Sequence, residues 1–430
     1  MKKAFSELIH NKLIKNEVNY LYRDKNNEKK IIFNNVIFTN IMLNDNLIIW
    51  NESSYQISQI FTGGLNIDSI QFVNCIFKKE TIFKTTLNYN YQIEKCNFDI
   101  MKFKKIHKKE RTQVGKYYKY KIEIINTNGN VLNIENCEFN SKFYINPQYN
   151  NFENRTCEIS SLIIEETVFN ENFKLHDCEV SLVNINNTDF LKNADFFKSK
   201  FLQEKKDITF KSINFGGLAL FGECKFYSTF IMEYVTITGL SHFREAEFFA
   251  GLNLDKSNIE KEMNFFNIKG LKDISIKNDT SQETYRILKF NCEKIGNIIE
   301  ANKYHALELE KKKETIKFND NETDWMVFQA NYLTSRFGTH WVYPIVGILL
   351  VGLLTLLGLH YEKLSELYDS TDLINGTIFW SGLDKAFEYM YILNKDKNFQ
   401  EHGFIFLLNK ISLGYLYYQF VTAIRKDTRK

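Results

Sequence analysis

Six of the seven cysteines of this chain share one pattern, in which the cysteine stands two positions before a large apolar residue. The pairs are Cys75 with Phe77, Cys96 with Phe98, Cys137 with Phe139, Cys157 with Ile159, Cys178 with Val180, and Cys224 with Phe226. The first five cysteines are separated by 21, 41, 20 and 21 residues, so the period is close to twenty. A fixed period of this length predicts a chain wound into coils, each stacked on the one before.

Other small residues take the same position where cysteine is missing. One period after Cys178 the position holds Ser199, and one period after Cys224 it holds Ala246. Neighbouring coils of such a column pair as strands about 4.8 Å apart, so equivalent positions stack into internal rows. The sequence therefore predicts a mainly β solenoid with a core ladder of Cys75, Phe77, Cys96, Phe98, Cys137, Phe139, Cys178, Cys224, Phe226 and Phe248.

The cysteines of this ladder are expected to be small buried residues. A metal site needs clustered ligands such as a Cys-x-x-Cys pair, and the chain has none. Its eight histidines are scattered, and it has no phosphate-binding glycine loop and no nucleophile motif. We therefore expect no metal, no cofactor and no enzyme activity. Free thiols and the lack of a secretory signal favour a reducing compartment.

Three segments resemble the pentapeptide-repeat proteins, namely Asn74-Cys75-Ile76-Phe77, Asn136-Cys137-Glu138-Phe139 and Glu223-Cys224-Lys225-Phe226. The resemblance implies a right-handed, quadrilateral β-helix over about residues 31–278. Residues 1–30 are charged and are expected to cap the first coil, whose strand edges would otherwise be open.

Between Cys96 and Cys137 one coil appears without its motif, and residues 104–121 are basic and aromatic instead. Such a segment can bind phosphate or an anionic leaflet, or can form a solvated hairpin that protrudes from the column. The net charge of the chain is only +3, so we expect no nucleic-acid partner. A ligand or protein partner on the β-helix stays open.

Residues 279–318 are expected to form a helical connector that begins at a capping box, Thr280 to Glu283. Apolar residues then recur at alternating intervals of three and four, which is the pattern of a heptad seam. The candidate seam consists of Leu288, Ile295, Ile299, Asn302 and Leu309. The seam could join subunits of a homo-oligomer, or it could pack on the same chain.

The C-terminal region contains two candidate membrane spans. Val342 to Leu359 is uncharged, and together with a juxtamembrane helix it makes up residues 325–361. A second span is expected in residues 403–430, followed by a basic tail, although it contains Asn409, Lys410 and Gln419. Residues 362–402 would form an extracytoplasmic loop with an apolar, helix-like stripe.

Basic residues flank the outer ends of both spans, with Arg336 before the first and Arg425 and Lys426 after the second. The positive-inside rule then places the protein in the inner (plasma) membrane, with both termini and the β-helix in the cytoplasm. Partners would be the lipid bilayer and further copies of the chain.

This layout resembles two-helix ion channels, in which a short pore helix lies between an outer and an inner helix. No Thr-Val-Gly-Tyr-Gly filter follows the stripe, so potassium selectivity is unsupported. We expect an oligomeric pore lined by Asn409, Lys410 and Gln419, whose opening is biased by a solenoid that senses a ligand. The alternative is a membrane-anchored scaffold without conductance. Several cellular roles, phage defence among them, would fit either.

Overall fold

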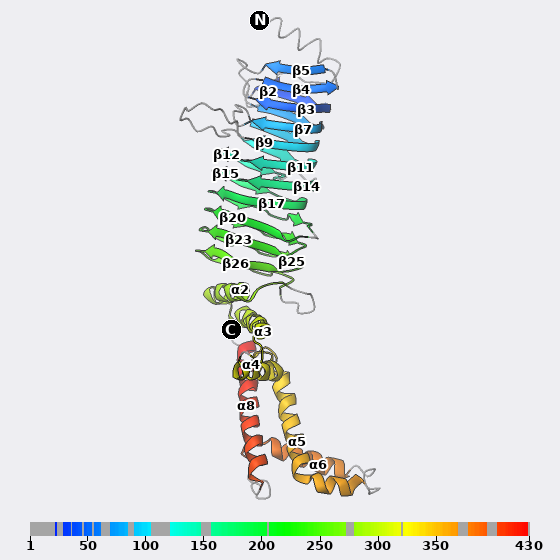
Figure 1. The fold of residues 1–430 in the computed structure, drawn as a ribbon, viewed down its shortest axis with the longest axis vertical. Helices are drawn as coiled ribbons and strands as arrows, with labels where there is room; N and C mark the ends of the chain where they lie inside the picture. Colours follow the sequence, from blue (N-terminus) through cyan, green and yellow to red (C-terminus); the bar gives the residue numbers. More distant parts are fainter. Residues whose placement is uncertain are drawn as a thin grey trace. The chain divides into compact units, whose positions relative to one another are not determined.

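The computed structural model describes residues 22–23, 29–35, 37–44, 47–53, 56–61, 69–84, 90–104, 121–147, 156–203, 206–271, 279–319, 321–368, 377–393 and 402–428. The chain divides into two compact units, Met1–Thr284 and Tyr285–Lys430. The first is built from strands and the second from helices (Figure 1).

The strands of the first unit form two sheets in the described residues. The 11-stranded sheet contains, in order, β1 (Tyr22–Arg23), β2 (Lys29–Asn34), β6 (Ser69–Val73), β8 (Asn90–Glu94), β10 (Ile122–Ile125), β13 (Phe143–Ile145), β16 (Phe173–Leu175), β18 (Ala194–Asp195), β21 (Ala219–Leu220), β24 (Ser241–His242) and β27 (Met263–Asn264).

The 16-stranded sheet runs along one path with five strands beside it. The path is β25 (Glu247–Phe248), β22 (Lys225–Phe226), β19 (Lys200–Phe201), β17 (Cys178–Phe190), β14 (Cys157–Glu165), β11 (Asn128–Glu135), β9 (Asn97–Lys104), β7 (Ile76–Lys84), β3 (Ile37–Asn44), β4 (Leu47–Ser53) and β5 (Gln56–Phe61). The other strands are β12 (Glu138–Phe139), β15 (Val168–Phe169), β20 (Ile208–Phe215), β23 (Phe230–Ile237) and β26 (Leu252–Ile259).

Strands from successive coils pair in parallel, as a solenoid requires. Phe77 lies opposite Phe98, and Phe226 lies opposite Phe248. Figure 1 shows these strands stacked one above the other along the first unit. The prediction of a parallel β solenoid is therefore confirmed, and its core is the expected row of buried phenylalanines.

Antiparallel strands occur at the N-terminal end of the column. β4 pairs with β3, and β5 pairs with β4, both antiparallel. β1 pairs antiparallel with β2 in the other sheet. The repeat did not predict these strands, and most of the expected cap in residues 1–30 lies outside the described residues. So does nearly all of the basic insertion, from 105 to 120.

One member of the core ladder was assigned to the wrong row. Cys137 does not stack between Cys96 and Cys157; the residue between them is Thr127. Thr127 is 31 residues after Cys96 and 30 before Cys157, so each of these two intervals is about ten residues longer than the period. The interval of 41 residues from Cys96 to Cys137 therefore connects residues of two different rows. In the coil whose motif seemed to be missing, Thr127 takes the place of cysteine.

Cys137 and Phe139 instead begin a second row, offset by half a coil. The Cys137 amide donates to Thr167 Oγ1, and Phe139 lies opposite Phe169. Phe169 in turn lies opposite Phe190, and their rings stack with centroids 5.1 Å apart. Both rows therefore repeat the same unit, a small residue two positions before a large apolar one.

The residue before most of the small corner residues has a left-handed backbone, which explains the short motif. Asn74 (φ 51°) precedes Cys75, and Asn136 (φ 53°) precedes Cys137. Asparagine tolerates this conformation better than most non-glycine residues. The polar residue of the motif therefore makes the turn, and the small residue after it fits the tight corner.

The second unit contains α3 (Ile298–Thr315), α4 (Glu322–Ser335), α5 (Val342–Tyr368), α6 (Thr377–Met390) and α8 (Gly403–Thr428), and α2 (Gln282–Lys294) begins at its boundary. The connector was expected as one continuous helix, and this is wrong: Gly296 (φ 77°) separates α2 from α3. Asn297 caps the new helix by accepting from the Glu300 amide.

The start of α2 differs by one residue from the predicted capping box. Ser281, not Thr280, accepts the hydrogen bond from the Thr284 amide. Thr280 and Thr284 instead accept hydrogen bonds from the Leu252 and Leu254 amides of β26. The two threonines thus provide acceptors for backbone amides on the open edge of the last long strand. The end of a solenoid requires such partners, because its last strand has no further strand to pair with.

Candidate functional site: polar contacts within the helical unit

Among the described helices, only α5 is long and apolar enough to cross a membrane by length and composition. The candidate span is Val342–Leu359, of which 17% is buried inside the chain. The first predicted span is therefore supported to this extent. The second predicted span, in α8, does not pass the same test, because its polar residues lower the average hydropathy.

α5, α6 and α8 pack together around a small apolar core. Its buried members are Ile348 of α5, Ala386 and Met390 of α6, and Leu413 and Leu416 of α8. α6 lies where the apolar stripe of the loop predicted a helix, but of that stripe Met390 is buried here whereas Phe387 is exposed.

Asn409, one of the three predicted pore-lining residues, is buried inside this bundle. Its Nδ2 donates to Thr355 Oγ1 of α5 at 2.8 Å and to the Tyr389 carbonyl of α6 at 3.2 Å. The amide thus joins all three helices. Thr355 is an isolated polar residue in an apolar run, and this signal could have paired it with Asn409 from the sequence.

Gln419, the second predicted lining residue, joins α8 to α4. Ser335 Oγ donates to Gln419 Oε1 at 2.8 Å, and Gln419 Nε2 donates to Asn331 Oδ1 at 2.8 Å. Both Ser335 and Gln419 are buried. Sequence analysis did not identify Asn331 or Ser335, because α4 carries no pattern that marks them.

Lys410, the third candidate, donates from Nζ to the Tyr391 carbonyl at 2.9 Å. The three polar residues of α8 therefore have different partners in one protomer, and Asn409 and Gln419 lie inside it. Within the chain, Asn409 and Gln419 hold helices together, and the prediction that they line a shared pore stays a prediction.

The predicted oligomerisation seam does not lie on one face. Leu288 is fully buried in α2, whereas Ile295 is 55% exposed at the break. Asn302 donates from Nδ2 to the Lys426 carbonyl at 3.1 Å, so the polar member of the seam contacts the end of α8. Ile299 and Leu309 are half-buried. Whether α3 also contacts a second copy stays a prediction.

Glu308 forms a buried ionic cluster where α2 and α3 meet. Its carboxylate accepts from Arg286 Nε at 3.0 Å and from Lys289 Nζ at 2.8 Å, and His305 Nδ1 lies 3.4 Å away. Burial alone would raise the pKa of Glu308, but the hydrogen bonds from Lys289, Arg286 and His305 outweigh it and lower the pKa. The charged form of Glu308 is therefore favoured.

His305 has the opposite preference, for its neutral form. Burial lowers its pKa, the hydrogen bond to Glu308 opposes this, and the charges of Lys426 and Lys289 lower the pKa further. A group whose pKa is lowered on folding contributes stability above its unfolded pKa and loses it as the pH falls. The loss begins below about 6.5 for His305 and below about 4.5 for Glu308.

We therefore expect the α2–α3 pair to lose stability between pH 7.5 and pH 5.5, mainly through His305. In His305→Gln this part of the pH dependence should disappear, while the loss below about pH 4.5 remains. Denaturant unfolding of the full chain in detergent at several pH values measures this. Equal pH dependence in the variant and the wild type would contradict the assignment.

The solenoid has a small pocket with a volume of about 240 Å³. It lies over Gly129, which stands where neighbouring coils have phenylalanine or another large apolar residue; the Phe98 ring covers the glycine. The rim is polar and includes Asn97, Asp99, Asn128, Asn130, Glu158 and Ser160.

The cysteines of the solenoid are buried thiols. Burial raises the pKa of the Cys224 thiol, so this group is a poor nucleophile at neutral pH. Within the described residues no group of three or more histidine, cysteine or carboxylate side chains is placed to hold a metal ion.

Comparisons of the chain with known protein families, with curated proteins and with solved structures found no match.

Proposed function

We propose that this chain is a membrane-anchored β-solenoid protein. In this proposal α5 and α8 cross the bilayer as an antiparallel pair, with α6 beside them, and the solenoid stays on the cytoplasmic side as a right-handed, four-sided binding column. Its pocket over Gly129 is the candidate place for a small polar ligand, because amide and carboxylate side chains surround it.

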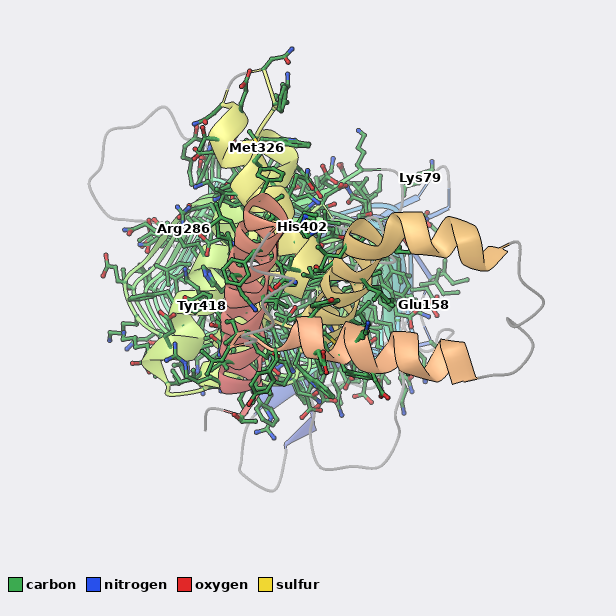
Figure 2. All side chains as sticks on the ribbon, turned by 90° about the horizontal axis from the view of Figure 1, so that it is seen from below. Lys79, Glu158, Arg286, Met326, His402 and Tyr418 are labelled. Carbon is green, nitrogen blue, oxygen red and sulfur yellow. The ribbon has the colours of Figure 1, made fainter. Side chains whose placement is uncertain are left out.

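One observation carries the proposal: α8 has two polar side chains inside the bundle and many large apolar side chains outside it. Asn409 and Gln419 are buried, whereas the exposed large residues of the helix body are Phe404, Leu407, Leu408, Ile411, Tyr418, Val421 and Ile424. Tyr418, labelled in Figure 2, is 66% exposed. This arrangement suits lipid, where polar groups must find partners within the protein.

The outer surface of α5 is equally apolar and supports the same interpretation. Its exposed residues include Val346, Leu349, Leu350, Leu353, Leu354 and Leu357. Residues 403–424 of α8 would span about 33 Å, which matches a hydrocarbon core of about 30 Å. Average hydropathy underrates α8 because it counts the buried polar residues as if they faced lipid.

The test is the membrane retention of the full-length chain in phosphatidylcholine vesicles. We expect the wild type to remain with the vesicles after an alkaline carbonate wash. The double variant Leu350→Asp/Leu354→Asp should be lost, since each aspartate near the middle of a span costs about 3 kcal/mol. Leu350→Ala/Leu354→Ala is the matched control and should be retained. Release of the wild type by carbonate would refute the membrane anchor.

An oligomeric pore is the second candidate function, and the position of α6 favours it. α6 is a short helix between two longer ones, and it contacts both through Ala386 and Met390. With Asn409 and Gln419 engaged inside the protomer, such a pore would need other lining groups, for instance around Lys410. A closed ring that conducts ions in planar bilayers would favour the pore, whereas a silent monomer would favour the anchor.

A further inference from the structure

Three cations of the helical unit lie over aromatic rings and define what we call the basic–aromatic cluster. The pairs are Lys312 Nζ over Phe328 (5.3 Å to the ring centroid), Lys313 Nζ over Tyr332 (3.4 Å) and Arg336 Cζ over Tyr343 (5.3 Å). The residues come from α3, from α4 and the turn that follows it, and from the start of α5. Three separate segments thus bring their cations and rings to one region.

In the part of the chain that the structure describes, these three cations have no ionic partner, unlike two neighbouring lysines of α3. On the same helix, Lys303 pairs with Glu300 at 3.1 Å and Lys311 pairs with Glu314 at 3.4 Å. Within the described residues, no carboxylate lies within 4.0 Å of the three cations of the cluster. They are therefore available to an anion from outside the chain.

Glu310 is a carboxyl group near the basic–aromatic cluster, and its negative charge would repel an anion bound there. Burial raises its pKa, and the charges of Arg336 and Lys313 act in the other direction. It makes no ion pair with either cation in the described residues. The cluster with Glu310 ionised therefore still carries a net charge of about +2, from three cations and one carboxylate.

The turn that carries Arg336 is held in an unusual conformation. Arg336, Phe337 and Gly338 all have positive φ angles, of 44°, 59° and 80°. The Gly338 amide donates to the Ser335 carbonyl and hydroxyl, and Lys426 Nζ donates to the Phe337 carbonyl at 3.1 Å. Left-handed residues other than glycine are costly and persist where surrounding contacts impose them. These contacts hold Arg336 in place.

The cluster lies at one end of the α5–α8 pair. Arg336 precedes the uncharged run that begins at Val342, and Lys426 follows the end of the apolar part of α8. The bond from Lys426 to Phe337 joins these two ends directly. If α5 and α8 cross the bilayer as proposed above, this end lies at the level of the lipid headgroups, beside Trp341 and Tyr343.

We infer that Lys312, Lys313 and Arg336 form a binding site for the phosphate of an anionic phospholipid headgroup. The planar guanidinium group can donate two parallel hydrogen bonds to a phosphate, and the two ammonium groups add charge. The aromatic rings beneath the cations suit the membrane interface, where amphipathic rings are enriched. Since each basic residue near an anionic surface contributes about fivefold, three together give a preference of about a hundredfold at most.

The experiment uses the full-length protein in phosphatidylcholine vesicles and measures quenching of its tryptophan fluorescence by brominated lipid. Trp325 and Trp341 lie close to the cluster in sequence, so a bound brominated lipid quenches them. We expect brominated phosphatidylglycerol to quench at a mole fraction at least tenfold lower than brominated phosphatidylcholine. Lys312→Gln/Lys313→Gln should lose most of this preference, and Arg336→Gln should weaken it as well.

The matched control is Lys303→Gln/Lys311→Gln, which removes two charges from the same helix but from paired lysines. This variant should keep the preference, because the inference depends on the unpaired cations and not on total charge. Circular dichroism checks that each variant is folded. An equal loss in both double variants would overturn the inference, and so would a wild type without preference.

Two further measurements distinguish lipid phosphate from free phosphate, and the lipid-site inference from the proposed membrane anchor. If soluble glycerol phosphate at millimolar concentration displaces the brominated lipid, the site is one for free phosphate, and the lipid inference is overturned. This inference rests on the proposed membrane anchor. Carbonate-resistant insertion into phosphatidylcholine without a preference for phosphatidylglycerol would refute the inference alone, whereas failure to insert would refute the anchor.

Discussion

Phe221→Ala is expected to destabilise the solenoid by about 3–5 kcal/mol, the usual cost of removing a fully buried phenylalanine ring. Phe221 is 0% exposed. Its ring stacks between Phe196 and Phe243, with centroids 4.9 Å and 4.8 Å away. The substitution removes a ring from an internal row in which each member contacts the next, and the rigid coils cannot collapse into the space. Urea unfolding of the full chain measures the change.

Phe197→Ala is the matched control, because it makes the same substitution one coil away from Phe221. Phe197 is half-buried and lies on an outer corner, where its ring meets His176 edge-on with centroids 6.0 Å apart. We expect a loss of about 1 kcal/mol, since part of the ring already faces solvent. Similar losses in both variants would contradict the assignment of Phe221 to the core row.

Gly352→Leu is expected to separate α6 from α5 and to destabilise the helical unit by several kcal/mol. A Cβ atom at position 352 would lie 2.6 Å from Met390 Cγ and 2.8 Å from the Ala386 carbonyl oxygen. The carbonyl is backbone and cannot rotate away, so α6 itself must move. Small residues allow such close approach of helices in membranes. Thermal unfolding in detergent, with amide exchange of α6, measures the effect.

Gly358→Leu is the control on the same helix. The nearest atom to a Cβ there is Ile405 Cδ1 at 3.7 Å, which is an ordinary contact. Both substitutions raise helix propensity and apolarity equally, so only the contact with α6 differs. If Gly352→Leu unfolds at the same temperature as Gly358→Leu, the close packing of α5 on α6 is wrong.

The repeat predicted most of the fold of the first unit, and there is a physical reason why it did not predict all of it. Stacking requires the same side-chain size at the same place in each coil, so a period near twenty residues reveals the column. Cysteine alone did not identify the row, because threonine fills the same corner at Thr127. Extra residues within a coil change the spacing without changing the register, which is how Cys137 was assigned to the wrong row.

The helical unit was predicted less completely, because average properties do not record the direction of side chains. The apolar run of α5 is evident from the sequence, because it is apolar on all sides of the helix. In α8 the same helix carries apolar and polar residues, and only their partners decide which side faces out. Thr355, Ser335 and Asn331 bind the polar groups of α8, yet they lie 54, 84 and 88 residues from them.

By itself, the sequence determined that the first unit is a parallel solenoid with a phenylalanine core and that one C-terminal helix is apolar enough to enter a membrane. Both follow from local or periodic patterns, which are set by residue type and spacing. Only the tertiary structure decided that the connector breaks at Gly296, that Asn409 and Gln419 hold helices together, and that Lys312, Lys313 and Arg336 lie over aromatic rings from separate segments. These features depend on contacts between residues distant in the chain, and the identity of a residue does not determine its partner.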